Sequence, residues 1–182
     1  MRERPILFSA EMVKAILEGK KTQTRRVIRN PGRYDNIRGC DFCCPFGQVG
    51  DLLWCRETWN LIETLDGRPV KVVYRASPET YTEYLSIHWR PSIFMPRWAS
   101  RILLEITSIK VKRLQEITPS DIEAEGHRPF AYPDSIQELS SAWAYSWYRN
   151  LWDSLNGKKY PWASNPWVWC ISFKRLAIRK EG

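Results

Sequence analysis

The sequence lacks the features that define several protein classes. No apolar run among its 182 residues approaches 18 residues, so we expect no transmembrane helix and no membrane partner. The first five residues lead into no apolar segment of the kind a secretion signal needs, which favours a cytoplasmic location. Internal repeats, a dinucleotide-binding glycine motif and a Ser-His-Asp pattern are also missing.

Cysteine is scarce, and its spacing does not complete a metal site. The five cysteines are an odd number, which favours reduced thiols in a cytosol. Cys40, Cys43 and Cys44 resemble half of a zinc site, but the remaining cysteines and both histidines are scattered singly. We therefore predict neither a metal nor a cofactor and interpret the three as ordinary loop thiols.

Glycine is rarer than tryptophan, and the charge is unevenly distributed. The chain has nine glycines, ten tryptophans and a formal net charge of +8. Between Lys20 and Arg38, seven basic residues stand against Asp35 alone. A local basic patch is typical of proteins that bind a phosphate-bearing partner, and tryptophan supplies both core volume and surfaces on which bases stack.

Hydrophobic periodicity predicts a mixed α+β chain. We expect strands at residues 6–8, 22–28, 51–61, 70–75, 101–114 and 167–173, and helices at 10–19, 118–126 and from 135 onward. A hairpin turn is predicted at 65–68. Along 101–114 the apolar positions change phase after Ile106, which indicates a bulge in a strongly curved sheet or small barrel.

The sharpest motif lies where the first helix ends and a strand begins, at residues 19–26. In a strand, Thr24 and Arg26 share one face, while Lys21 and Arg25 share the other. The backbone turns at the helix end, so Lys21 is still able to approach Thr24. A hydroxyl flanked by cations suits a phosphate, or a nucleophile activated by a lysine of lowered pKa. The alternative is a solvated basic edge strand.

This motif, Gly19-x-Lys21-Thr22-x-Thr24-x-Arg26 after a short amphipathic helix, resembles the ASCH superfamily. Segments 4–9, 50–59, 89–101, 151–156 and 165–169 resemble a longer phage and prophage branch of it. The resemblance spans nearly the whole chain. It implies a single α+β domain over 1–182, a PUA-like curved β-barrel with helices packed around it, and insertions at about 30–50 and 77–99.

One ASCH branch hydrolyses N4-acetylcytidine to cytidine with a lysine as proton acceptor, a threonine as nucleophile and a glutamate as proton donor. The resemblance puts Lys21, Thr24 and Glu125 in these roles. A desolvated Lys21 beside Arg26 would lose its proton often enough to accept that of Thr24. The alternative for Glu125 is a solvated acid near a helix end. The chain is longer than the compact amidohydrolases, so its insertions are able to reshape the pocket.

Other residues are candidates for binding. Arg26 and Glu57 are predicted to contact the substrate, with Glu57 either a pocket carboxylate or simply paired with an arginine. Trp98, with Arg97 and Arg101, forms an aromatic and basic cluster suited to stacking and phosphate contact, although tryptophan is more often core. Trp89 and Trp98 are the candidates for exposure. Trp143 and Trp147, at helical spacing, are predicted to be core.

Two kinds of function follow from the sequence. The first is an enzyme that removes the N4-acyl group of acetylated cytidine. The second is a non-catalytic module that binds RNA or a modified base, with Lys21, Arg25 and Arg26 as phosphate contacts. A ribonuclease in the same basic cleft is a third possibility, because a Lys-Thr-Arg cluster also stabilises a pentavalent phosphate. The RNA or nucleoside, the role of the insertions and the oligomeric state stay open.

Overall fold

The computed structural model describes residues 1–29, 44–63, 68–77, 88–127 and 137–176. Its strands are β1 (Glu3–Leu7), β2 (Gln23–Val27), β3 (Leu52–Arg56), β4 (Trp59–Glu63), β5 (Pro69–Tyr74), β6 (Leu103–Arg113) and β7 (Trp167–Arg175). Its helices are α1 (Ala10–Leu17), α3 (Pro119–Ala124) and α4 (Gln137–Asn156), with single 3₁₀ turns η4 (Ser92–Phe94), η5 (Arg97–Ala99), η6 (Leu114–Glu116) and η8 (Trp162–Ser164). The predicted α+β class is confirmed. Among the described residues, no helix is both long and apolar enough to cross a membrane.

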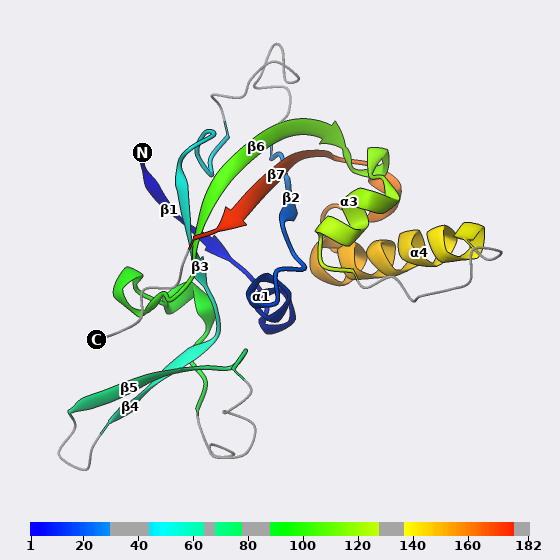
Figure 1. The fold of residues 1–182 in the computed structure, drawn as a ribbon. Coiled ribbons are helices and arrows are strands. Elements are labelled where there is room, and N and C mark those ends of the chain that lie inside the picture. The colour runs from blue at the N-terminus through cyan, green and yellow to red at the C-terminus, as the bar shows by residue number, and fades with distance from the viewer. Residues whose placement is uncertain (30–43, 64–67, 78–87, 128–136, 177–182) are drawn as a thin grey trace.

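Five strands form one strongly curved sheet in the order β1-β3-β6-β7-β2 (Figure 1). In a flat sheet of this width the two outer strands would lie roughly 19 Å apart. Here Nη2 of Arg26 on β2 donates to the carbonyl oxygen of Leu7 on β1 at 2.6 Å. The sheet therefore rolls until its outer strands face each other. The register shift between Ile106 and Ser108 on β6 confirms the predicted bulge, which accommodates this bend.

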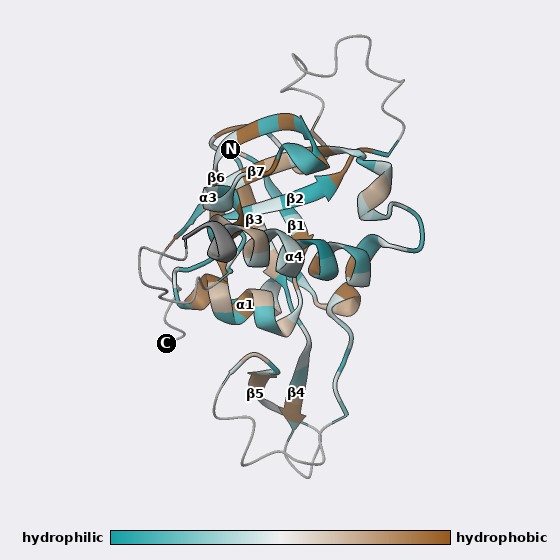
Figure 2. Ribbon diagram, turned by 90° about the vertical axis from the view of Figure 1, so that its right-hand side faces the viewer, coloured by the Kyte–Doolittle hydropathy of each residue, from teal (hydrophilic) through white to brown (hydrophobic). Residues whose placement is uncertain are grey.

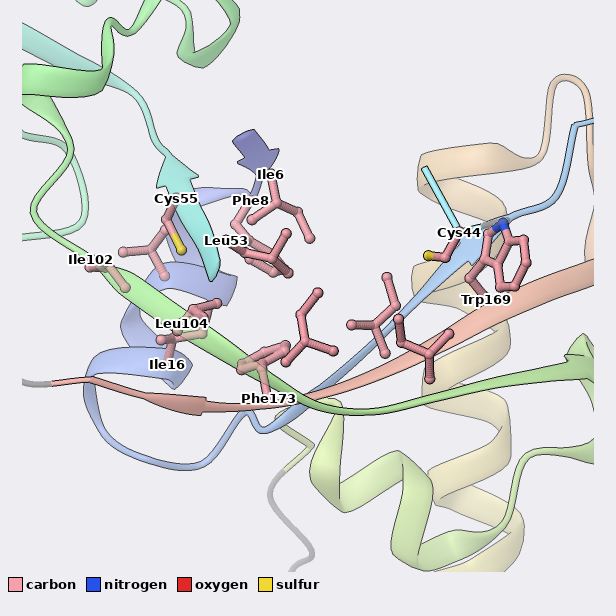
Figure 3. Close-up of a cluster of buried hydrophobic side chains, with 14 of the residues drawn as sticks. Ile6, Phe8, Ile16, Cys44, Leu53, Cys55, Ile102, Leu104, Trp169 and Phe173 are labelled. Atoms are coloured by element: carbon pink, nitrogen blue, oxygen red, sulfur yellow. The ribbon is translucent and has the colours of Figure 1, made fainter. Parts of the chain in front are cut away.

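The concave side of the sheet encloses the main hydrophobic core (Figure 3). Helix α1 closes this core because Val13 and Ile16 lie on one helical face and are buried, while Ser9 caps the helix start. The labelled side chains converge from β1, α1, β3, β6 and β7, and they include Ile6, Phe8, Ile16, Leu53, Leu104, Trp169 and Phe173.

The convex side of β2 and β7 is covered by α3 and α4, which form a second core. The α4 residues that face the sheet are Ala144, Tyr148 and Trp152, which recur every four residues. The prediction that Trp143 is core was therefore wrong, because Trp143 is 44% exposed and lies one position away from this stripe. Its ring and that of Trp147 lie against the ring of His127.

The predicted strand at 51–61 is instead two strands, β3 and β4, interrupted at Glu57 and Thr58. After this break β4 pairs with β5 in a separate two-stranded sheet that extends away from the main sheet (Figures 1 and 2). Trp59, Tyr74 and Met95 form a small core at its base. The β4–β5 hairpin was predicted, but most of its turn, like Cys40 and Cys43, lies outside the described residues.

Candidate functional site

A cavity of about 350 Å³ opens between the two outer strands and α4. Four consecutive residues of β2 line it, from Thr24 to Val27. Consecutive residues of a strand point to opposite faces, so all four reach one cavity only because β2 is an edge strand. The remaining walls come from the end of β1, the start of α1, α4 and two residues near β4 and η4, and they include Leu7, Phe8, Ser9, Met12, Thr58, Ser92, Tyr148, Leu151, Trp152, Leu155 and Asn156. Glu125 completes the polar part of the lining.

Two glycines bring the start of β2 against the end of α3. Gly19, with φ +73°, ends α1, and the backbone N–H of Lys21 then donates to the carbonyl of Ala15. Gly126 has φ +99°, and a Cβ there would lie 3.1 Å from Cβ of Ala15 and 3.4 Å from that of Lys21. These glycines allow Lys21 and Glu125 to form an isolated antiparallel bridge.

Lys21 and Glu125 form a buried ion pair. Nζ of Lys21 donates to Oε2 of Glu125 at 2.7 Å and to the carbonyl oxygen of the same residue at 2.9 Å. The two residues are 2% and 6% exposed. Burial lowers the pKa of Lys21; the Glu125 carboxylate opposes this shift, and the charges of Arg26 and Arg25 add to it. The fold thus brings two of the three catalytic candidates, Lys21 and Glu125, into direct contact.

Arg25 and Tyr148 complete the contacts of the Glu125 carboxylate. Arg25 is buried, forms an ion pair with Asp121 at 2.8 Å, and contacts Oε1 of Glu125 at 3.3 Å. The Tyr148 hydroxyl donates to Oε1 of Glu125 at 3.5 Å. Burial raises the pKa of Tyr148, and the neighbouring Glu125 adds to this shift, so the phenol remains a proton donor. Arg25, predicted as a nucleic-acid contact, thus lies inside the cavity wall.

Thr24 lies on the concave side of β2 and lines the same cavity as Glu125. It is 3% exposed, and its side chain makes no hydrogen bond with any described residue. Within the described part of the chain, Lys21 is not among the lining residues and its ammonium does not contact the Thr24 hydroxyl. The fold thus pairs Lys21 with Glu125, and it places Glu125 and Thr24 in the lining of one cavity.

Arg26 lines the cavity beside Phe8 and Leu7. Its guanidinium lies over the Phe8 ring, 5.2 Å from the centroid, and holds the Leu7 carbonyl. Its Nε is buried and has no hydrogen-bond partner in the structure. Among the described residues no carboxylate forms an ion pair with this side chain. Arg26 therefore has hydrogen-bonding capacity left for a ligand.

Glu57 and Arg101, both predicted to be binding residues, are bound to each other and do not line the cavity. Nε and Nη2 of Arg101 donate to the two carboxylate oxygens of Glu57, both at 3.0 Å. Nη1 of Arg101 donates to Ser77, and its guanidinium lies 4.0 Å from the centroid of the Tyr74 ring. Burial raises the pKa of Glu57, although its bonds to Arg101 lower it. Glu57 is therefore paired with an arginine, but it is buried, and it is not among the residues that line the cavity.

Trp98 is 64% exposed, as predicted. Its ring lies nearly perpendicular to that of Trp59, with the two ring centroids 5.9 Å apart. Arg97 forms an ion pair with Glu3 at 2.7 Å. Arg97 and Arg101, the predicted basic partners of Trp98, are thus each paired with a carboxylate, Glu3 and Glu57. The role of Trp98, Arg97 and Arg101 in binding stays a prediction.

Sequence reasoning missed two residues of the site, Tyr148 and Asp121. Asp121 lies at the start of α3, where its side chain accepts from the backbone N–H of Thr118. Its second partner, Arg25, comes from a distant strand. Tyr148 is adjacent to a tryptophan pair that dominated the helical pattern. The signal that could have identified Tyr148 is its spacing of four residues from Ala144 and Trp152, the other buried positions of α4.

No group of three or more potential metal ligands gathers among the described residues. Cys44 is buried, and burial raises its pKa to about 11, although backbone hydrogen bonds oppose the shift. The other two cysteines of the half zinc motif, Cys40 and Cys43, lie outside the described residues, so the prediction of ordinary thiols stays a prediction.

Comparison with known proteins gives matches among solved structures alone. No protein-family model and no curated protein matches the chain. One similar structure is an ASCH domain from Lactobacillus crispatus JV V101, with a TM-score of 0.45, 16% identity, and coverage of 96% of this chain and 79% of that one. Another is a protein of the family DUF984 from Enterococcus faecalis V583, with a TM-score of 0.43, 11% identity, and coverage of 92% and 68%.

Proposed function

We propose that this protein hydrolyses the N4-acyl amide of acetylated cytidine, as a nucleoside or within RNA, in the cavity between β1, β2 and α4. The observation that carries the proposal is the buried Lys21–Glu125 pair, whose carboxylate shares a cavity with the unbonded hydroxyl of Thr24. A volume of about 350 Å³ is within the range of small-molecule sites. The lining combines apolar side chains, such as Phe8, Met12 and Leu151, with polar groups, as a pyrimidine ring with a polar edge requires.

In the first chemical step Thr24 Oγ1 attacks the amide carbonyl and Lys21 accepts its proton. The lowered pKa of Lys21 favours the neutral amine that this step needs. Because Nζ of Lys21 is bonded to Glu125, the proton can continue to that carboxylate. Lys21 must turn toward Thr24 when substrate binds, and catalytic hydrogen bonds commonly tighten in this way on substrate binding.

In the second step the carbon–nitrogen bond breaks and Glu125 gives the proton to the departing N4 amine. This leaves cytidine and an acyl ester on Thr24. Water then hydrolyses the ester, releases the carboxylic acid and restores the threonine. The cations around Glu125 and the Tyr148 hydroxyl keep its carboxylate in place during both steps.

The test is the formation of cytidine from N4-acetylcytidine, followed by mass spectrometry. We expect Thr24→Val to reduce turnover by about 10³-fold or more while binding of N4-acetylcytidine is retained, and Thr24→Ser to keep part of the activity. Thr22→Val is the matched control, because Thr22 is exposed and does not line the cavity. Absence of cytidine with the wild-type protein would reject the hydrolase and leave non-catalytic binding of RNA or a modified base.

A further inference from the structure

A second chamber adjoins the cavity of the proposed active site. It has a volume of about 610 Å³ and shares Leu7, Arg26, Val27 and Asn156 with the first chamber, the cavity of about 350 Å³. The shared residues form the boundary between the two. Beyond it the second chamber is lined by Ile28, Arg29, Pro45, Phe46, Tyr160 and Trp169. A ligand is therefore able to extend from one chamber into the other past Arg26.

The two chambers differ in charge. In the first, Glu125 already has Lys21 and Arg25 as ion-pair partners. The described lining of the second includes two arginines and no acidic residue. Arg26 has a buried Nε without a partner, and Arg29 is exposed and forms no ion pair with a described residue. The second chamber thus presents positive charge that the described residues leave unbalanced, which favours an anion.

The shape of the second chamber adds to this preference. Arg26 lies at its boundary with the first chamber, and Phe46, Tyr160 and Trp169 supply aromatic walls beyond. An anion at Arg26 would be adjacent to whatever occupies the first chamber. Guanidinium groups form short charge-assisted hydrogen bonds with phosphate oxygens, and Arg26 has donors free for them.

We propose that the two chambers together bind a nucleotide, with the base in the first chamber and the phosphate against Arg26 and Arg29. The placement of the base rests on the function proposed above. The phosphate site rests on the second chamber alone. The preferred ligand is then a phosphorylated nucleoside rather than a free one.

Calorimetric titration of cytidine, cytidine 5′-monophosphate, cytidine 3′-monophosphate and inorganic phosphate tests this proposal. We expect one monophosphate to bind about tenfold or more tightly than cytidine at low salt, and this advantage to shrink as ionic strength rises. Arg29→Ala should remove most of the advantage. Arg149→Ala is the matched control, since Arg149 is an exposed arginine of α4 that lines neither chamber.

Three results would overturn the phosphate site: equal affinities for cytidine and both monophosphates, equal losses in the Arg29→Ala and Arg149→Ala proteins, or no binding of either monophosphate. Binding of inorganic phosphate as tight as that of the nucleotides would keep an anion site but overturn the nucleotide proposal, because the nucleoside would then add nothing to the affinity. Hydrolysis is measured separately. Equal kcat/KM for N4-acetylcytidine and its 5′-monophosphate would reject the phosphate site and keep the hydrolase, whereas nucleotide preference without hydrolysis would do the reverse.

Discussion

Two glutamates are buried in the described part of the chain, Glu57 and Glu125, and their charges are neutralised in different ways. Glu57 meets one arginine through two parallel hydrogen bonds, and the third nitrogen of that arginine is taken by Ser77. Glu125 has three partners: Lys21, which precedes β2, Arg25 of β2 and Tyr148 of α4. One side of Glu125 also lines a cavity, which the Glu57 side chain does not.

This difference separates a structural ion pair from a candidate site. Around Glu57 the charges balance one to one and the donors of Arg101 are used within the protein. Glu125 and Asp121 are the two carboxylates of the site. Four cations surround them: Lys21, Arg25, Arg26 and, 3.8 Å from Asp121, Lys112. The excess positive charge is buried beside open volume, which is unfavourable for folding and favourable for binding an anionic ligand.

The comparison predicts that breaking the Glu57 pair costs mainly stability. Arg101→Met leaves a carboxylate that is 1% exposed without its partner, and we expect the free energy of unfolding to fall by about 3–5 kcal/mol in urea titrations. Arg97→Met is the matched control, because the Arg97–Glu3 pair is exposed and should contribute less than about 1 kcal/mol. Similar small losses in both variants would show that the buried pair is not structural.

Removing one donor from Glu125 should have a smaller effect on stability and a larger one on activity. Tyr148→Phe leaves Lys21 and Arg25 on the carboxylate, so we expect about 1 kcal/mol of destabilisation. The carboxylate is then less firmly held, and we expect kcat for N4-acetylcytidine to fall about tenfold, with a displaced pH–rate profile.

Tyr145→Phe is the control for this prediction. Its hydroxyl, also on α4, donates to the carbonyl of Ile117, away from the cavity. The same loss of one hydrogen bond should leave kcat and the pH–rate profile as in the wild type. If Tyr145→Phe and Tyr148→Phe lowered kcat equally, Tyr148 would have no positioning role.

Local features of the fold could be predicted because neighbouring residues determine them. The Ser9 cap fixes the start of α1, and the Thr118 cap with a proline behind it fixes that of α3. The bulge in β6 follows from a change of hydrophobic phase within one strand. Lys21, Thr24 and Glu125 were singled out by resemblance to a family, and their arrangement in one region depends on the bend of the whole sheet.

The remaining features depend on contacts between distant segments. Glu57 and Arg101 are 44 positions apart in the sequence, and nothing near Glu57 identifies which arginine it meets. Helical spacing alone does not decide which tryptophan of α4 is buried: Trp152 faces β2 and β7 with Ala144 and Tyr148. Trp143 is instead exposed and lies against His127, a contact with a distant segment. The second chamber combines residues of β2, β7 and two loops, which no local pattern relates.

The smallest expected effect concerns the pH dependence of stability. Because the pKa of Lys21 is below its ordinary value of 10.5, the unfolded chain binds more protons than the folded one between the two values. Lys21 therefore makes the free energy of unfolding rise with pH in that window, by at most about 1.4 kcal/mol per pH unit. In Lys21→Met this contribution disappears, while the titrations of the cysteines and tyrosines persist. The difference in free energy of unfolding between the wild type and Lys21→Met, measured in urea titrations from neutral pH to pH 10.5, should therefore change with pH. A constant difference would mean that Lys21 titrates alike in both states, and the Glu125 cluster would then resemble the balanced Glu57 pair.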